Sequence, residues 1–207
     1  MKKGLLVLLV LGGLAVLLVL AGRGTYNGLV GKREAVDSQW GKVSNQYQRR
    51  ADLVPNLVKT VQGSADFEKS VLKEVTEARA SVGRVTMDAS NAPDNAAKLQ
   101  EFQKAQGDFG AALSRLLVVA ERYPDLKASA GFRDLQVQLE GTENRIAVER
   151  GRFNEVAQTY NTSVRGFPTV IFAGMLGFQP KPYFEAQSGA EKPPEVNFDF
   201  SGKPATE

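Results

Sequence analysis

The sequence contains no histidine and no cysteine among its 207 residues. Without histidine the chain lacks the commonest general base and the favoured protein ligand of zinc, copper and non-haem iron. Without cysteine it has no disulfide, no thiolate site and no thiol for lipid attachment. The glycine-rich nucleotide-binding motifs and the GxSxG nucleophile motif are missing as well. We therefore expect a protein that is not an enzyme and has no cofactor and no metal site.

The chain also lacks a strong excess of one charge. It has 26 basic and 23 acidic residues, and Lys2 and Lys3 at the N-terminus account for most of the difference. The remainder is close to neutral, which argues against a general affinity for nucleic acid. About 180 residues follow the N-terminal region, enough for one domain with a real core.

One long apolar run is present. Residues 4–22 read GLLVLLVLGGLAVLLVLAG, nineteen residues without a charge. As a helix this run would be ~28 Å long, close to the thickness of the hydrocarbon core of a bilayer. Arg23 follows it, and Tyr26 supplies an interfacial ring. We predict that residues 1–24 are a single-pass transmembrane anchor, which contacts the lipid bilayer through residues 4–22.

A cleavable signal peptide is the alternative for this run, because small residues at 19–21 could be recognised by a peptidase. Secretory apolar regions usually have about 7–15 residues, so the greater length favours a retained anchor.

The charges that flank the run bear on the side of the membrane where the domain lies. Lys2 and Lys3 favour a cytoplasmic N-terminus, whereas Arg23, Lys32 and Arg33 favour the opposite orientation. We predict that the domain lies on the extracytoplasmic side, in a bacterial cell envelope.

Apolar residues recur with a helical period after the anchor. Steps of four and three residues connect Leu29 to Val82, Leu99 to Tyr123, and Phe132 to Tyr160. A 3.5-residue period in three segments predicts long helices that pack side by side. We predict an all-α fold in which residues 25–178 form a long antiparallel bundle of three to four helices.

Prolines and capping residues mark the expected helix ends. Residues 91–94 suit a helix start, and Pro124 ends the second segment. About six residues separate the second and third segments, which predicts an antiparallel hairpin. Pro55 leaves two alternatives open. It either kinks one helix from about 28 to 84, ~85 Å long, or separates two helices, with Asp52 as the cap of the second.

The C-terminal part lacks a helical period. Five of the nine prolines lie between Pro180 and Pro204, and we predict a Pro-rich extended tail over residues 179–207. Residues 196–200 alternate like a strand; they either pair with a partner's sheet edge or, as we favour, pack on the bundle or stay loose. Residues 167–178 are apolar but too short to span a bilayer. We expect them to cap one end of the bundle; a monotopic membrane contact is the alternative.

Several residue clusters resemble those of a known family. They are Tyr26, Asn27, Leu29, Val30 and Arg33, then Gln39 and Trp40, the runs 49–58, 115–128 and 132–148, and finally Phe153, Asn154, Tyr160, Asn161, Phe167, Pro168, Gly177, Phe178, Tyr183, Phe184 and Glu185. In these clusters the chain is similar to the LemA proteins, over about residues 25–186. The resemblance implies an N-terminal single-pass anchor and a helical bundle. It implies no chemistry, since the family's molecular function is unsettled. The chain has Phe67 where members often carry histidine, and Gly151 interrupts an Arg-Arg pair.

Polar residues interrupt the apolar segments at core-facing positions. We predict an internal polar layer of Arg50, Gln106, Thr142 and Glu149. A buried charge is costly unless it is paired, so we expect an ion pair between Arg50 and Glu149, with hydrogen bonds from the other two residues. The layer either fixes helix register, which we favour, or forms an interior binding or proton-handling site.

Glu140 and Glu143 form a carboxylate pair beside Arg145. Such a pair could bind a hard cation or act as acid and base. Dimetal sites in bundles pair glutamate with a histidine three residues later, which is impossible here. We expect Gly141 to allow close packing and the charges to form salt bridges.

The turn between the second and third segments is our candidate partner-docking surface. Tyr123, Pro124, Asp125 and Lys127 combine an aromatic ring, a proline and both charge signs in an exposed turn. The alternative is an ordinary solvated face.

The anchor, the long helices, the tail and the lack of catalytic residues favour a membrane-anchored, non-catalytic scaffold or adaptor. Its expected partner is an unknown membrane or envelope protein. A membrane-shaping or lipid-surface-binding protein is the first alternative, and a carboxylate-based hydrolase or metal-binding enzyme is the second.

Overall fold

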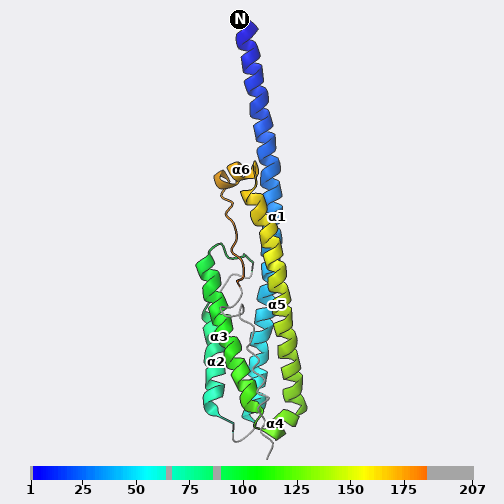
Figure 1. Ribbon diagram of the computed structural model, residues 1–207, viewed down its shortest axis with the longest axis vertical. Helices are drawn as coiled ribbons and strands as arrows, with labels where there is room; N and C mark the ends of the chain where they lie inside the picture. The colour runs from blue at the N-terminus through cyan, green and yellow to red at the C-terminus, as the bar shows by residue number, and fades with distance from the viewer. Residues whose placement is uncertain (1, 64–66, 86–89, 186–207) are drawn as a thin grey trace, which may run out of the picture.

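The computed structural model describes residues 2–63, 67–85 and 90–185, and all regular secondary structure in these ranges is helical (Figure 1). The helices are α1 (Lys2–Gln62), α2 (Lys69–Arg84), α3 (Ala96–Ala120), α4 (Pro124–Ala128), α5 (Ala130–Arg165) and α6 (Thr169–Met175). The predicted all-α fold is confirmed. Residues 186–207 of the predicted tail, which include the strand-like stretch 196–200, lie outside the described residues.

Helix α1 joins the apolar run to the first amphipathic segment without a break. It has 61 residues, which corresponds to ~90 Å. Of the described helices, α1 alone is long and apolar enough to cross a membrane, and none of its most apolar 18-residue window is buried. Buried side chains begin at Leu29, which is 2% exposed. One half of α1 therefore projects from the bundle and the other half forms part of it.

Pro55 lies inside α1, so the alternative of one helix through this proline is correct at the proline but wrong about the helix end near residue 84. Helix α1 continues through Pro55 to Gln62, and the chain reverses before α2 begins at Lys69. A proline inside a helix costs about 3 kcal/mol. Val54, Leu57 and Val61 are all fully buried in one apolar cluster, and this packing holds the helix past the proline.

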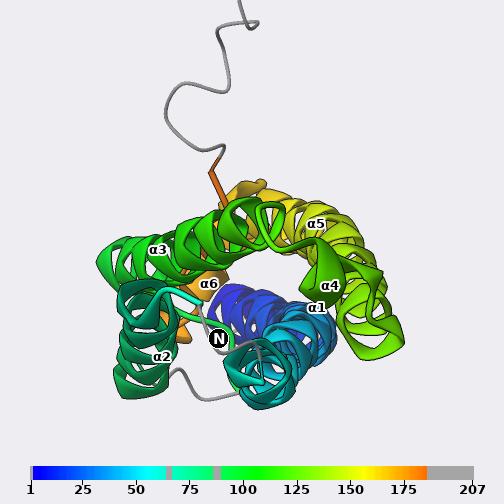
Figure 2. The same ribbon diagram turned by 90° about the horizontal axis from the view of Figure 1, so that it is seen from below.

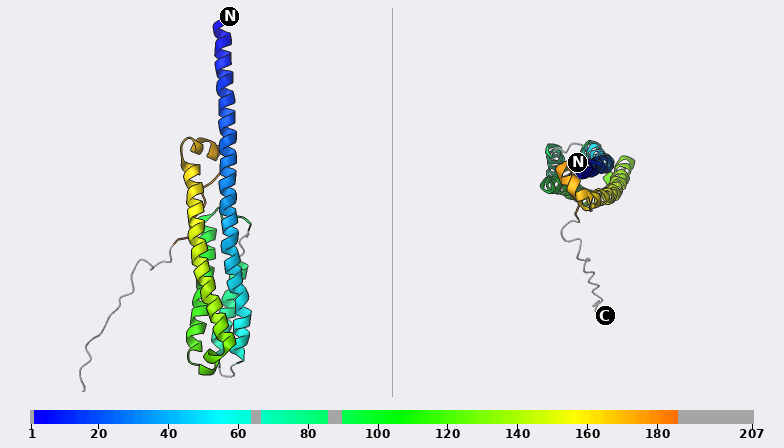
Figure 3. Two further views of the ribbon diagram at one scale, coloured as in Figure 1. Left: turned by 90° about the vertical axis from the view of Figure 1, so that its right-hand side faces the viewer. Right: turned by 90° about the horizontal axis from the view of Figure 1, so that it is seen from above.

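Within the described residues, four helices form the bundle. Helices α1 and α5 lie side by side along most of the bundle's length, and the hairpin of α2 and α3 covers only the half farther from the N-terminus (Figures 1 and 3). Seen along the long axis, α1, α2, α3 and α5 surround a common core (Figure 2). Helix α4 closes the far end, which we call the distal end. Helix α6 lies against α1 at the other end, which we call the proximal end.

Local sequence signals explain the helix ends. The side chain of Asn95 caps α3 by accepting a hydrogen bond from Ala97 N at 2.8 Å. This cap lies one residue beyond the predicted 91–94 region. Ser129 caps α5 by accepting from Phe132 N at 3.4 Å, and Pro124 occupies the first turn of α4. The chain does reverse from α3 through the short α4 into α5, but the predicted pairing of the second and third segments is wrong, because α3 packs mainly on α2 and α5 packs mainly on α1.

Buried apolar residues divide into two clusters. The distal cluster gathers mainly aliphatic residues of α1, α2, α3, α4 and α5 around Leu57 and Leu116. The proximal cluster is built around Trp40 and includes Phe153, Phe178 and Phe184. Phe178 and Phe184 belong to this second cluster. The first seven residues of the predicted tail, 179–185, have no regular secondary structure and run along the bundle as an extended chain (Figure 1).

Candidate functional site

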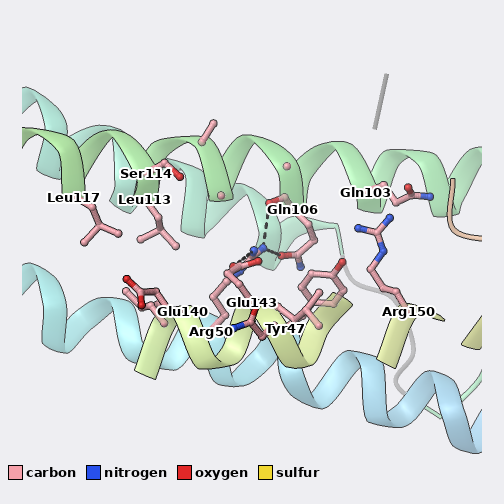
Figure 4. A pocket seen from close by; sticks show the side chains of 16 residues that line it. Tyr47, Arg50, Gln103, Gln106, Leu113, Ser114, Leu117, Glu140, Glu143 and Arg150 are labelled. Atoms are coloured by element: carbon pink, nitrogen blue, oxygen red, sulfur yellow. Dashed lines mark hydrogen bonds and ion pairs between the residues drawn. The ribbon is translucent and has the colours of Figure 1, made fainter. Parts of the chain in front are cut away.

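Arg50 of α1 is the central charged group of the bundle interior. Its side chain is 4% exposed. Nη1 donates to Glu143 Oε1 of α5 at 2.5 Å, and Nη2 donates to Gln106 Oε1 and Gln106 O of α3 at 2.5 and 3.1 Å (Figure 4). The guanidinium carbon lies 5.3 Å from the ring centre of Tyr47 and 5.1 Å from that of Phe109. Arg50 thereby ties three helices together through charge-assisted hydrogen bonds and two aromatic faces.

The predicted ion pair between Arg50 and Glu149 is wrong. Glu149 instead accepts from Gln39 Nε2 at 2.6 Å and from Arg152 Nη1 at 2.7 Å, whereas Arg50 pairs with Glu143. The reason is geometric, because Glu143 lies at the edge of the core, where the long Arg50 side chain reaches a carboxylate that stays half-exposed to water. The Glu143 side chain is 49% exposed. A carboxylate in that position avoids the full desolvation that a buried partner would suffer.

Of the other two members of the predicted layer, one contacts Arg50 and the other bonds within its own helix. Gln106 lies beside Arg50, as expected, and is buried. Thr142 is also buried, but its hydroxyl donates to Gln138 O of its own helix at 2.7 Å. The structure therefore unites Arg50 with Gln106 and separates both from Thr142 and Glu149. The position of Glu143 beside the core residues Leu139, Thr142 and Ile146 was the sequence signal that could have identified the true partner.

A groove of about 730 Å³ opens between α3 and α5, with α1 residues at its base (Figure 4). It is lined by Tyr47 and Arg50 from α1, Gln103 and Ser114 from α3, and Glu140 and Arg150 from α5, among others. Burial raises the pKa of the Tyr47 hydroxyl, while Arg150 and Arg50 oppose that increase. The groove offers both hydrogen-bond donors and acceptors, and its lining includes side chains of both charges.

The chemistry of this groove is limited. Within the described ranges, no group of three or more acidic residues is arranged to hold a metal ion. Gln136 Nε2 donates to Glu140 at 3.1 Å and Glu143 is paired with Arg50, so both carboxylates of the predicted pair take part in side-chain hydrogen bonds. This arrangement suits a structural polar layer with an open side.

A second polar cluster lies near the proximal end and was missed in the sequence. Lys181 is 2% exposed, and its Nζ contacts Ala92 O at 2.7 Å, Asp94 Oδ1 at 2.5 Å and Asp37 Oδ1 at 3.7 Å. Asn161 of α5 accepts from Lys181 N at 2.7 Å and donates to Lys181 O at 2.8 Å. No periodic pattern surrounds Lys181. The buried Asn161 on the apolar face of α5 was the one available signal.

Asn154 repeats this arrangement two turns earlier on α5. It accepts from Phe184 N and donates to Phe184 O, both at 2.9 Å. Seven helical residues and three extended residues both cover ~10 Å, so the two asparagines match the spacing of Lys181 and Phe184. We call residues 178–185 the strap, because they run along α5 and are held by these paired bonds.

The predicted docking turn forms the distal end of the molecule. Pro124, Asp125 and Lys127 are exposed, and Lys127 pairs with Glu121. Tyr123 is half-buried, and its ring centre lies 5.1 Å from that of Phe67. The four residues therefore lie together, as one exposed charged surface with Tyr123 anchoring it to the bundle.

Comparisons with known proteins agree with this architecture. The family described as the LemA family matches residues 39–198. Magnetosome protein MamQ of Magnetospirillum gryphiswaldense is 26% identical over 187 residues, which covers 81% of this chain and 67% of the relative. Magnetosome protein MamQ 2 of Paramagnetospirillum magneticum is 27% identical over 187 residues, again 81% of this chain and 67% of the relative. Protein LemA of Metamycoplasma hominis is 20% identical over 163 residues, 79% of this chain and 70% of the relative. The match extends over most of the bundle and the strap, and it confirms the resemblance seen in the sequence: the chain belongs to the LemA family.

Proposed function

We propose that the protein is a non-catalytic scaffold or adaptor that displays the distal end of its bundle at a fixed height above the membrane. The partner would be another membrane or envelope protein. Membrane association follows from the apolar half of α1 and from the family. The extracytoplasmic side remains our proposal and rests on Lys2 and Lys3.

The continuity of α1 carries this proposal. The helix has no break between Gly22, where the apolar run ends, and Gln62 at the distal end. These forty residues correspond to a rise of ~60 Å. A protein that only needed to be tethered would be served by a flexible linker. A continuous helix supported by α5 instead keeps the distal end at a fixed distance from the membrane along the α1 axis.

The distal surface has the chemistry of a docking site that can be changed without unfolding the protein. In the ion pair of Lys127 with Glu121, both side chains are more than half exposed. Such exposed pairs contribute only about 0–1 kcal/mol to stability. Asp125 adds a further exposed charge in the first turn of α4. Selection for stability gives little reason for this charge pattern, whereas a partner of complementary charge would use it.

Site-specific cross-linking tests the docking proposal. The full chain would carry one photoreactive group on Asp125→Cys, in its native membrane. A matched chain would carry it on Glu101→Cys, an exposed acidic position in the first turns of α3. We expect one discrete protein adduct from position 125, none from position 101, and loss of the adduct when Lys127→Glu is added.

Two outcomes would contradict the proposal. One is an equal set of adducts from positions 125 and 101, which would mean random collisions. The other is an enzymatic turnover of the purified chain that Glu143→Gln or Glu140→Gln abolishes while the fold is kept. The sidedness is tested separately, by labelling Gln62→Cys in cells with a membrane-impermeant maleimide before and after lysis. Labelling only after lysis would place the domain in the cytoplasm.

A further inference from the structure

Helix α6 and its flanks expose an unusual concentration of large apolar side chains. Phe167 and Met175 are 84% and 83% exposed, and Val170, Ile171 and Leu176 are between 43% and 54% exposed. We call these five residues the α6 patch. On the described surface of α3 and α5, exposed large apolar residues such as Val118 and Val137 are instead isolated among polar neighbours. Contiguous apolar surface of this kind marks an interaction site.

The α6 patch lies level with the end of the transmembrane run. A Cβ atom placed on Gly22, the last residue of that run, would lie 4.0 Å from the Phe172 ring of α6. Just after the patch, Phe178 makes an edge contact with Tyr26 of α1, with ring centres 5.7 Å apart. Figure 1 shows α6 beside α1 where the free half of α1 begins. The patch therefore sits at the height where hydrocarbon gives way to headgroups.

We propose that the α6 patch inserts into the membrane interface, in the leaflet from which α1 emerges. Continuity identifies lipid as the occupant, because the α1 surface from Leu5 to Leu20 that faces the hydrocarbon adjoins this patch. Short segments of this type bury their apolar face about 5–10 Å into the boundary between headgroups and acyl chains. The contact would be a second, monotopic one next to the span.

Charge at the proximal end agrees with a lipid surface. Residues 166–180 contain no charged residue, so no ionised group would have to enter the interface. Arg165 ends α5 just before the patch, and Arg23 directly follows the apolar run of α1. Long arginine side chains reach headgroup phosphates while their aliphatic parts remain near apolar surface.

This inference rests on the membrane anchor of the proposed function and deepens it. A single helix can tilt and rotate in a bilayer. A second contact beside it, formed by α6 packed on α1, would restrict both motions and set the direction of the bundle. The distal end would then be held upright by two contacts and not by one.

The natural absence of cysteine allows a direct test with single nitroxide labels on the full chain in phospholipid nanodiscs. Labels would be placed at Met175→Cys and Phe167→Cys in the patch. Leu11→Cys provides the membrane reference, and Val118→Cys, an exposed apolar position on α3, provides the aqueous reference. Accessibility to oxygen, which concentrates in hydrocarbon, would be compared with accessibility to a water-soluble nickel chelate.

We expect both patch labels to show higher oxygen and lower nickel accessibility than Val118→Cys, with values between those of Val118→Cys and Leu11→Cys, as an interfacial depth requires. Adding Ile171→Glu should move the Met175 label toward the values of Val118→Cys. Nickel accessibility equal to that of Val118→Cys would overturn the inference. Low accessibility to both reagents would also overturn it, because it indicates a protein contact such as a second copy. Neither result would affect the cross-link from position 125, so failure here is distinguishable from failure of the proposed function.

Discussion

The distal and proximal halves of the bundle form their cores from different elements and different residue types. In the distal half, α2 and α3 complete a four-helix arrangement with α1 and α5, and the core is mostly aliphatic. In the proximal half, α2 is absent and the strap lies against the bundle in an extended conformation. There the core is aromatic: Trp40 stacks on Phe184 at 5.9 Å and makes edge contacts with Phe102 and Phe153 at 5.5 and 5.7 Å.

The difference shows how an extended segment can replace a helix. A helix satisfies its own backbone groups, but an extended chain beside a helix leaves its N–H and C=O groups without ladder partners. Asn154 and Asn161 meet that need at Phe184 and Lys181. Large rings fill much of the core of the proximal half. The proximal half therefore depends on a few specific side chains, whereas the distal half depends on many interchangeable aliphatic contacts.

The Arg50 cluster lies between the two halves. Tyr47, one turn before it, belongs to the proximal cluster, and Ala51, next in the chain, belongs to the distal cluster. Buried polar groups in helical bundles fix register. Arg50 bonds to α3 and α5 where the core changes character, and we propose that these bonds set how the two helices align with α1.

The largest expected effect comes from Trp40→Ala. The side chain is fully buried and contacts three aromatic rings, so we expect a loss of about 3–5 kcal/mol in the free energy of unfolding. Leu57→Ala in the distal core should cost about 2–5 kcal/mol. Denaturant unfolding of the full chain in detergent, followed by circular dichroism, measures both. Val137→Ala, an exposed change, should stay within about 0.5 kcal/mol. An equally small loss of stability for Trp40→Ala and Val137→Ala would contradict the view that the proximal core depends on a few aromatic side chains.

The strap gives the next largest effect. Asn161→Ala leaves the buried N–H and C=O of Lys181 without their partner, and we expect a loss of about 1–3 kcal/mol. Asn144→Ala removes an exposed asparagine from the same helix and should be nearly neutral. Limited proteolysis would show cleavage near residues 179–185 in the first variant alone. Unchanged resistance would mean that the strap is held by its aromatic residues without the asparagine bonds.

The boundary between the halves gives the smallest effect. Glu143→Gln removes the charge of a half-exposed partner while Arg50 keeps its bonds to Gln106, so we expect a loss of about 1 kcal/mol. Glu140→Gln, in the same groove, is the matched control and should change stability less. A double-mutant cycle with Arg50→Met isolates the coupling between the two residues. A coupling of zero would show that Gln106 alone satisfies Arg50.

The sequence predicted the helical elements well because the apolar period is a local signal. Residues on the expected faces, such as Val36, Trp40, Leu99 and Phe153, are buried. The reversal after Gln62 was missed, since Val61, Val71 and Val75 all pack in one core and the period does not record a change of direction. Pro55 is the residue that the sequence marks as a possible helix end, whereas α1 ends at Gln62.

The site was harder to predict because it depends on which residues of different helices come together. The sequence predicts Arg50 as a buried charge because it lies at a core-facing position of the helical apolar period. Its choice of Glu143 over Glu149 depends on the axial alignment of α1 and α5, which no local pattern specifies. Lys181 was missed because a lysine in a Pro-rich segment ordinarily faces solvent, and its burial requires Asp37, Asp94 and Asn161 at once.

The height of the distal end above the membrane tests the central claim most directly. A donor fluorophore on Gln62→Cys would be combined with acceptor-labelled lipid headgroups in nanodiscs that contain the full chain, with Gly31→Cys as the near reference. A continuous, upright α1 predicts a donor ~60 Å from the headgroup plane for Gln62→Cys and strong transfer only for Gly31→Cys. Inserting a flexible glycine-serine linker after Gly24 should increase transfer at Gln62→Cys. Strong transfer at Gln62→Cys in the unmodified chain would mean that the bundle lies on the membrane, and would contradict the account.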